Sequence, residues 1–335
     1  MFVNSLVGGS IIEKESSPPK LHFLHIMNKN LFVSVIVPNY NYAKFLDERI
    51  QSILSQTYQN FEIIILDDCS SDNGASKIII EKYRTNPRVS HIVYNETNSG
   101  SPFKQWNKGF ELAKGELIWI AESDDFCSPV FLETLVPLYL KNEAVLTFCH
   151  SELVDENGHK LRENHQMNSV SSDISMNGKE FIKKYLAYSN EVQNASCAIF
   201  SKKAALDIDK QYMNYKGAGD WLFWINLAEK GNVCYASATC NNYRLHSNTT
   251  SKVVKSGLEF HEMKSIYEWL LKKNYLDDKR FQKCKLNNLF LISSIDEIPH
   301  NVKKELYHMW GADFIQLLMV RARSIISIFA RFLYA

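Results

Sequence analysis

Short apolar runs alternate with segments of helical periodicity over the first 150 residues of the chain. The first run, 32–37, is rich in β-branched residues and ends at Pro38, which predicts a buried strand. Apolar residues at helical spacing follow in 45–54, and a second run, 61–66, ends in two aspartates. The alternation predicts a mostly parallel, doubly wound sheet flanked by helices. We expect further strands at 89–93, 117–120 and 145–149, and helices ending near 83, over 103–113 and after an N-cap at Ser128.

The pattern loosens after residue 150. Residues 155–178 are polar and predict a loop region, whereas 197–200 predicts a short strand. A helix is expected from Trp221 to Lys230, stopped by Gly231. Several short strands are expected within 233–245, and from residue 256 the chain reads as helical throughout.

Composition places the chain among soluble globular proteins, with 335 residues, 45% of them hydrophobic and 22% charged. Its net charge of +1 offers no global field for nucleic acid. Seven cysteines without a C-x-x-C pair argue against a disulfide scaffold or a zinc finger, so we expect a reducing cytoplasm. The first 26 residues lack a signal-peptide pattern, which leaves Met27 as an alternative start, and no ordinary transmembrane helix is expected.

Two predicted strands end in acid pairs, Asp67-Asp68 and Asp124-Asp125. Ligands of open parallel sheets bind beyond the carboxyl ends of the strands, so these acids are candidate site residues. Neither a G-x-G-x-x-G motif nor a phosphate-binding G-x-x-x-x-G-K-[ST] motif is present. Carboxylates in their place indicate a divalent cation, Mg²⁺ or Mn²⁺, that bridges protein acids to a bound diphosphate.

Seven segments follow one another along the chain: 35–41 (VIVPNYN), 52–58 (SILSQTY), 62–72 (EIIILDDCSSD), 113–118 (AKGELI), 123–125 (SDD), 219–221 (GDW) and 243–246 (YRLH). In this order they resemble family 2 glycosyltransferases. The resemblance covers about residues 32–250 and implies a GT-A fold, Rossmann-like, with inverting transfer from a nucleotide-activated sugar, a UDP-sugar being expected. It divides the chain into an N-terminal extension (1–30), a GT-A domain (31–250; nucleotide-sugar half 31–128, acceptor half 129–250) and a C-terminal helical region (251–335).

The resemblance implies a nucleotide pocket at the ends of the first two strands. Pro38, Asn39 and Tyr40 would line the base pocket, with Tyr40 packed on the base. Asp68 would accept a hydrogen bond from the base. Lys104, in the loop before a predicted helix, would contact the donor, although a solvated lysine at a helix start explains it equally well.

The resemblance also assigns the metal and the diphosphate. Asp125 would bind the metal and Asp124 would reach the ribose or assist the metal, while Ser123 stands where the family's D-x-D motif has its first acid. His246 would add a contact to metal or diphosphate, with a structural histidine as the alternative. Arg244 would pair with a phosphate or with a core acid.

Asp220 matches the position of the family's general base. Inverting transfer needs a carboxylate to take the proton of the acceptor hydroxyl. Gly219 stands where many members have Glu, and the flexible-looking 217–219 segment would suit a close approach of substrate. The alternative reading makes Asp220 the N-cap of the following helix. Trp221 and Trp224 are expected to pack, with Trp221 as an alternative floor for the acceptor sugar.

The implied partners are a nucleotide-sugar donor and a saccharide or lipid-linked acceptor, as in bacterial surface polysaccharide or lipopolysaccharide assembly. Residues 312–335 carry apolar positions and three arginines, which suggests a peripheral contact with the inner face of the membrane; the alternative is a docked helix. Other readings are a nucleotidyltransferase, disfavoured by the missing Gly-rich loop, and a non-catalytic carbohydrate-binding or scaffold protein. A processive synthase is disfavoured by the lack of a Gln-x-x-Arg-Trp motif.

Overall fold

The structure of the protein, a computed structural model, describes residues 30–162, 164, 166–167, 170–246, 256–320 and 322. The expected N-terminal extension and the alternative start at Met27 therefore lie outside the described residues, apart from residue 30. The same holds for nearly all of the predicted membrane contact beyond residue 320.

The first half of the sheet is parallel, as the alternating pattern predicts. β1 (Val33–Asn39) lies between β2 (Phe61–Asp67) and β4 (Leu117–Ile120), and β3 (Val89–Tyr94) pairs with the outer edge of β2. All residues of β1, β2 and β4 are buried, which is why these strands are mostly apolar in sequence, with Ser34 and Glu62 as buried polar exceptions inside β1 and β2. The expected α/β fold with a mostly parallel central sheet is confirmed.

The second half of the sheet is mixed. β9 (Ala198–Ser201) runs antiparallel to β4 and to β6 (Ala144–Val154), and β10 (Asn232–Arg244) runs parallel to β6. β10 is one long strand rather than the several short strands we expected, because bulges between residues 236 and 241 let it keep its pairing with β6. The edge strand β5 (Phe126–Cys127) pairs with β10.

The polar 155–178 segment is not entirely loop, in contrast to the prediction. It contains β7 (Lys160–Arg162), which pairs with β6, and β8 (Ile174–Asn177), which pairs with β10. Both strands are short and mostly exposed at a sheet edge, so their sequences lack an apolar run.

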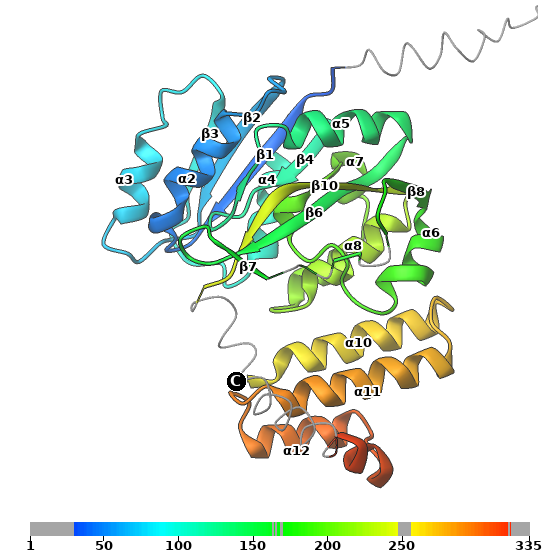
Figure 1. The fold of residues 1–335 in the computed structure, drawn as a ribbon. Coiled ribbons are helices and arrows are strands. Elements are labelled where there is room, and N and C mark those ends of the chain that lie inside the picture. The colour runs from blue at the N-terminus through cyan, green and yellow to red at the C-terminus, as the bar shows by residue number, and fades with distance from the viewer. Residues whose placement is uncertain are drawn as a thin grey trace, which may run out of the picture.

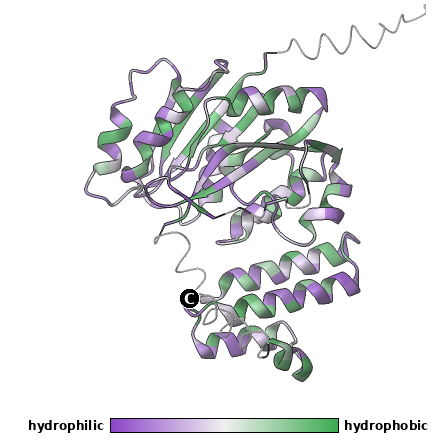
Figure 2. Cartoon of the chain, in the orientation of Figure 1, coloured by the Kyte–Doolittle hydropathy of each residue, from purple (hydrophilic) through white to green (hydrophobic). Residues whose placement is uncertain are grey.

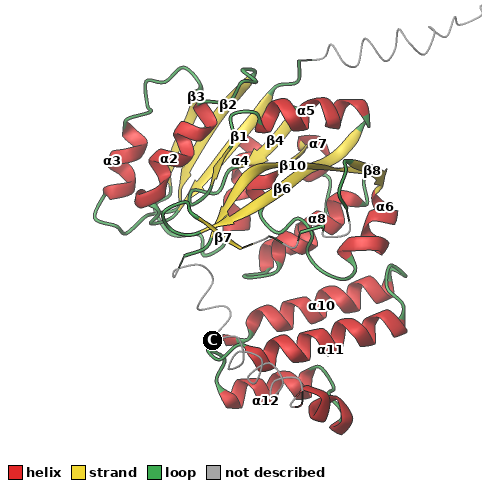
Figure 3. Cartoon of the chain, viewed as in Figure 1, coloured by secondary structure: helices red, strands yellow, loops and turns green. Residues whose placement is uncertain are grey.

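Helices flank the sheet, as Figures 1 and 3 show. The helix after the fourth strand begins at Phe131, and its N-cap is Val130 rather than the predicted Ser128. The hydroxyl of Ser128 instead accepts a 3.4 Å hydrogen bond from the Val130 amide. The described helices of this domain are α2 (Ala43–Leu54), α3 (Ala75–Glu81), α4 (Pro102–Leu112), α5 (Phe131–Lys141), α6 (Gly178–Phe181), α7 (Lys202–Leu206) and α8 (Gly219–Ala228). Short helical turns lie at Ile182–Leu186, directly after α6, at Ala195–Cys197 before β9 and at Lys210–Asn214 after α7.

Among the described residues, the expected C-terminal helical region contains α10 (Leu258–Lys272), α11 (Asp278–Ser294) and α12 (His300–Met309), and residues 314–320 are helical as well. They lie together beyond the α8 side of the sheet domain (Figure 1). α10 makes the junction, since Tyr267 Oη donates a 2.8 Å hydrogen bond to the carbonyl of Tyr188. Just beyond α10, Tyr275 Oη donates to Glu229 at 2.8 Å.

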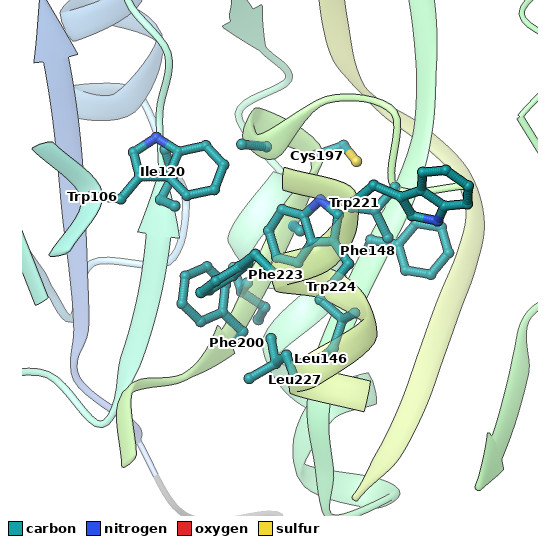
Figure 4. Packing of buried hydrophobic residues seen from close by; sticks show 14 of the residues in the cluster. Trp106, Ile120, Leu146, Phe148, Cys197, Phe200, Trp221, Phe223, Trp224 and Leu227 are labelled. Atoms are coloured by element: carbon teal, nitrogen blue, oxygen red, sulfur yellow. The ribbon is translucent and has the colours of Figure 1, made fainter. Parts of the chain in front are cut away.

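Strands and the inward faces of helices carry the apolar residues (Figure 2), and aromatic rings dominate where α8 meets the sheet. Figure 4 shows this packing around Phe200, Phe223 and Trp224, all completely buried. The Phe223 and Trp224 rings meet edge to face with centroids 4.8 Å apart. Trp221 is 2% exposed and donates through Nε1 to the Leu186 carbonyl, so both tryptophans pack as predicted.

Within the described part of the chain, no helix has the length and apolarity required to cross a membrane. Four large apolar side chains are exposed near its end: Phe314, Ile315, Leu318 and Met319.

Candidate active site

The carboxyl ends of β1, β2 and β4 bring the predicted donor-site residues to one edge of the sheet. The register pairs Asn39 with Asp67, and the hydroxyl of Ser123 donates a 2.6 Å hydrogen bond to the Pro38 carbonyl. The parallel sheet thus joins three sequence segments that are up to 85 residues apart.

Asp68 is 6% exposed, and its carboxylate holds the 95–101 segment in place. Its oxygens accept hydrogen bonds from the side chains of Asn95, Ser99 and Gln105 and from the Ser99 amide, at 2.6–3.1 Å. These contacts give Asp68 a structural task that sequence reasoning did not include. Its hydrogen bond to a nucleobase stays a prediction.

The residues expected around the base divide into buried and exposed ones. The Asn39 side chain is buried and donates a 2.7 Å hydrogen bond to Asp67, so it supports the turn from inside. Tyr40 is 44% exposed at the end of β1, where its ring is available for stacking. The exposed Lys104 donates to the carbonyl of Ser99 at 3.0 Å and therefore braces the same 95–101 segment.

Asp125 is buried to 1% exposure and surrounded by protein donors. Asn194 Nδ2 and Ser196 Oγ donate to Oδ2 at 2.9 and 2.6 Å, and the Arg244 amide donates to Oδ1 at 3.0 Å. Burial, followed by the nearby Asp124 charge, raises the pKa of the Asp125 carboxyl to about 6. Both oxygens of the residue expected to bind the metal are thus already engaged in joining β10 to the β4 loop.

Asp124 lies next to Asp125 but faces His246, with 3.0 Å between its Oδ2 and His246 Nε2. The histidine ring is oriented by Tyr42 and Phe45, whose ring centroids lie 5.4 and 5.3 Å from its own. The structure therefore pairs the second acid of the motif with the late histidine, two residues 122 positions apart.

Arg244 is a core residue of this region. Its guanidinium donates to the side chain of Glu48 at 2.6 Å and to the carbonyls of Asp124 and Glu156 at 2.7 and 2.8 Å. It also stacks over Phe45, with Cζ 4.8 Å from the ring centroid. Of the two readings of Arg244, pairing with an acid is the one these contacts match.

A further acid and a buried cation complete the electrostatics. Burial and the Asp124 charge raise the pKa of Glu122 to about 8, although its carboxylate accepts a 2.9 Å hydrogen bond from Trp106 Nε1. Arg49 is fully buried against the Trp119 ring, and no described group accepts a hydrogen bond from its guanidinium. Its charge lowers the pKa values of Glu122 and Asp125, so it acts as the counter-ion of the acid cluster.

Asp220 lies in the first turn of α8, whose N-cap is Ala218, so the predicted N-cap role is wrong. Burial raises the pKa of its carboxyl to about 7, and the negative charge of Glu259 adds to that rise. Asn190 Nδ2 donates to Asp220 Oδ2 at 2.8 Å, and the Trp221 amide donates to Oδ1 at 2.8 Å. A carboxyl group that ionises near neutral pH is suited to general base catalysis.

The segment before Asp220 is fixed by Glu262 of α10. Its carboxylate accepts the amide hydrogens of Lys216, Gly217 and Ala218 at 2.6, 2.8 and 2.8 Å. The segment that reads as flexible in the sequence is therefore held from the C-terminal region, 44 to 46 residues away.

Packing explains why glycine occupies position 219. A Cβ atom there would lie 2.4 Å from the Phe103 ring and 2.6 Å from the Tyr212 carbonyl. No side chain fits without a shift of α4 or of the Tyr212 backbone, which accounts for the departure from the family's glutamate.

A cavity of about 500 Å³ opens beside Asp220, between the sheet domain and the C-terminal helices. Its wall includes the 188–193 segment, the start of α8, Tyr243 of β10, Glu259 of α10 and Asn287 of α11. Tyr243 interacts electrostatically with Asp124, Asp125, Asp220 and Glu259, and burial raises its pKa above the ordinary tyrosine value. Tyr243 thus lies between the acid cluster and the cavity.

A family model described as glycosyl transferase family 2 matches residues 34–208, about half of the chain. The chain belongs to glycosyl transferase family 2. The expected family is therefore confirmed, and the enzyme is a glycosyltransferase.

Two curated relatives of this glycosyltransferase are named for the polymer they help to make or modify. The putative teichuronic acid biosynthesis glycosyltransferase TuaG of Bacillus subtilis is 27% identical over 220 residues, 65% of this chain and 81% of TuaG. The poly(ribitol-phosphate) beta-N-acetylglucosaminyltransferase TarS of Staphylococcus aureus is 41% identical over 97 residues, 28% of this chain but only 16% of TarS.

Solved structures share the fold at low identity. TarS 1–349 in complex with UDP superposes with a TM-score of 0.56 at 18% identity, covering 89% of this chain and 92% of that one. The mannosyltransferase PcManGT of Pyrobaculum calidifontis, in complex with GDP-Man and Mn²⁺, gives 0.58 at 15% identity, covering 92% and 88%. The likeness confirms the expected GT-A fold of this glycosyltransferase.

Sequence reasoning missed several residues of the site. Asn190, Asn194 and Ser196 approach the acids from a segment without a family motif, and Glu259 and Glu262 come from a helix beyond the resemblance. No spacing in the sequence of this glycosyltransferase indicates these contacts. Tyr243 lies inside a recognised motif. Its position as the next-to-last residue of a core strand, three residues before His246, was the available signal.

Proposed function

We propose that the enzyme transfers a sugar, with inversion at its anomeric carbon, from a nucleotide-diphosphate donor to a hydroxyl of a saccharide or lipid-linked acceptor. The observation that carries the proposal is the Asp220 carboxyl, whose pKa is raised to about 7 at the wall of a cavity that adjoins the acid cluster. Such a reaction requires a general base next to the acceptor hydroxyl and a binding site for the donor. Asp220 beside the cavity suits the first requirement, and the acids at the strand ends suit the second.

Asp124 and His246 are the residues we assign to a divalent cation. A carboxylate oxygen and an imidazole nitrogen converge at 3.0 Å, and both groups suit Mn²⁺ or Mg²⁺ when donor phosphates and water complete the shell. Among the described residues, no three histidine, cysteine or acidic side chains form a closed metal site, in keeping with a cation that binds together with the donor. When bound, the cation would neutralise charge on the leaving diphosphate.

Asp125 takes a supporting role in this proposal, in place of the ligand role expected from the sequence. Its oxygens are satisfied by Asn194, Ser196 and the Arg244 amide, and a metal would have to displace at least one of these donors. Asp125 instead fixes the loop that presents Asp124 and the strand that leads to His246.

Asp220 serves as the general base. It takes the proton of the acceptor hydroxyl while the hydroxyl oxygen attacks the anomeric carbon from the side opposite the leaving diphosphate. Asn190 orients the carboxylate through its 2.8 Å hydrogen bond, and Glu262 holds the backbone that leads to it. Partial exposure to the cavity leaves Asp220 accessible to the acceptor.

The donor end of the proposed site is the exposed Tyr40 ring and the 95–101 segment that Asp68 and Lys104 hold. A nucleobase fits this position by stacking on Tyr40. We assign a UDP-sugar as donor; TarS, the relative with that fold and 41% identity over its matched segment, has been crystallised with UDP-GlcNAc.

The testing experiment is a thermal-shift panel of UDP, GDP, dTDP and CMP, each with and without Mn²⁺, on the wild type and on Asp124→Asn. A ligand that binds the folded state raises the melting temperature by mass action. We expect UDP to stabilise the wild type in a Mn²⁺-dependent manner and to lose that dependence in Asp124→Asn. If no nucleotide shifts the wild type, the non-catalytic carbohydrate-binding reading replaces ours.

We also propose that the enzyme contacts the inner face of the cytoplasmic membrane peripherally, through residues 312–335. The exposed Phe314, Ile315, Leu318 and Met319 support it, as do the arginines that follow in the sequence. Sedimentation with anionic phosphatidylglycerol vesicles is expected for the wild type and reduced when these four residues are replaced by Ser. Equal sedimentation of both would remove this part of the proposal.

A further inference from the structure

The C-terminal helices supply one wall of the cavity beside Asp220, and that wall is rigidly attached to the sheet domain. Tyr267 Oη donates to the Tyr188 carbonyl at 2.8 Å, and Glu262 accepts three amide hydrogens from the 216–218 segment. α11 contributes Asn287 and Asn288 to the same wall. The cavity is therefore a composite of two parts of the chain that are held in a fixed relation.

We infer that this cavity binds the acceptor as an uncharged saccharide unit, and that residues of α10 and α11 determine this specificity. The inference rests on the proposed function, since it takes Asp220 as the base beside which the acceptor hydroxyl must lie. It assigns a substrate class to a surface that comes largely from outside the segment matched by the family model.

The charged residues that line the cavity are the first argument for an uncharged acceptor. Among the described residues that line the cavity, Asp220 and Glu259 are carboxylates, and none is a lysine, arginine or histidine. A phosphate or uronate group is usually bound by Arg or Lys, and beside two carboxylates it meets repulsion instead. An uncharged sugar avoids this repulsion.

The nearby cations are committed elsewhere. Lys216 Nζ donates to the Gly100 carbonyl at 2.6 Å, on the donor side of the fold. Lys285 of α11 donates to the Gly311 carbonyl. Arg280 pairs with Asp277, with 3.4 Å between Nε and Oδ2, and its guanidinium lies 5.9 Å from the ring of Tyr188, a residue of the cavity wall. None of these three side chains lines the cavity.

The remaining wall matches the groups of a neutral sugar. Amide side chains can donate to and accept from hydroxyls, and aromatic rings pack against the C–H faces of a pyranose. Asn190 donates its amide hydrogen to Asp220, and the side chains of Gln193 and Asn287 add further amide groups to the wall. Tyr188, Trp221 and Tyr267 provide the rings.

The test compares three acceptors that differ in one group: octyl β-glucoside, octyl β-glucuronide and octyl β-glucoside 6-phosphate. Transfer from the UDP-sugar found in the donor panel is measured with each, and binding is measured by NMR saturation transfer. We expect the neutral glycoside to be preferred by about tenfold or more in kcat/KM, because an anionic group in this partly buried site is repelled by the carboxylates beside it. In Glu259→Gln we expect the preference to fall at least about threefold, because one of the two charges is gone.

Glu268→Gln is the matched control, since Glu268 is on α10 but pairs with Lys264 and does not line the cavity. It should leave the preference unchanged. The inference is overturned if an anionic acceptor is preferred by the wild type, if Glu259→Gln keeps the full preference, or if the neutral glycoside neither reacts nor binds. Donor hydrolysis measured in the same assays separates this outcome from failure of the proposed function, which would abolish nucleotide binding and hydrolysis as well.

Discussion

Asn190 Nδ2 donates a 2.8 Å hydrogen bond to Oδ2 of Asp220, and this bond lowers the pKa of a carboxyl group that burial otherwise raises. Removing the donor in Asn190→Ala should therefore raise the pKa of Asp220 further. The ascending limb of the kcat/KM–pH profile is expected to move to higher pH, with most of the lost activity at pH 7 recovered by pH 9. A uniform loss at every pH would assign Asn190 a purely structural role.

Replacement of the base itself should separate activity from stability. Asp220→Asn is expected to lower kcat by about 10²–10⁴-fold, the usual contribution of a general base. Nucleotide binding in the thermal-shift assay should persist, because Asp220 is not among the donor-site residues. Full activity of Asp220→Asn would reject it as the base.

The Asp220→Asn variant also tests the raised pKa of Asp220, through the pH dependence of the melting temperature. The folded-state pKa is about 7 against an ordinary value of 3.8, so the native state keeps its proton where the unfolded state has lost it. This stabilising contribution is complete below pH about 4 and is lost as pH rises through about 7. The melting temperature of Asp220→Asn relative to wild type should therefore increase between pH 5 and pH 8. A constant difference would argue against the raised pKa.

Asp124 and Asp125 are neighbours with separable roles. Asp124→Asn should keep the melting temperature of the wild type but lose the Mn²⁺-dependent shift with UDP, because its carboxylate faces His246. Asp125→Asn should destabilise the fold by about 1–3 kcal/mol, since an amide NH₂ would face one of its three donors. A stable Asp125→Asn that loses metal dependence, beside an unaffected Asp124→Asn, would reverse the assignment.

Gly219→Ala should destabilise the protein by about 1–3 kcal/mol, the usual cost of overpacking. The added methyl would press on the Phe103 ring and the Tyr212 carbonyl. Chemical denaturation measures the change, with Lys279→Ala at an exposed position of α11 as control. An unchanged free energy of unfolding would show that α4 can shift to accommodate the methyl group without a loss of stability.

The sequence was most informative where burial is complete. The strand predicted at 117–120 is found with those bounds, and the 61–66 run becomes a strand one residue longer, because parallel strands buried on both faces are mostly apolar in sequence. The family motifs indicated Asp68, Asp124 and Asp220 as site residues, and all three lie in the candidate active site of the structure.

Long-range contacts lay beyond prediction. The alternative N-cap at Asp220 is wrong because α8 begins at Gly219, two residues before the predicted start at Trp221, where Gly219 packs tightly on Phe103. The choice between Asp124 and Asp125 depends on donors from residues 194, 196 and 244, which no local pattern brings together. Short edge strands such as β8 lack an apolar run altogether.

Glu262 has a consequence for how this enzyme can be divided or recombined. The three amide hydrogens that it accepts belong to the segment leading to Asp220, so a chain ended after the last strand would leave them without their partner. A minimal catalytic unit must therefore retain α10. A chimera that imports the C-terminal helices of another enzyme to change its acceptor should carry a carboxylate at this position and keep the length of the connection to it.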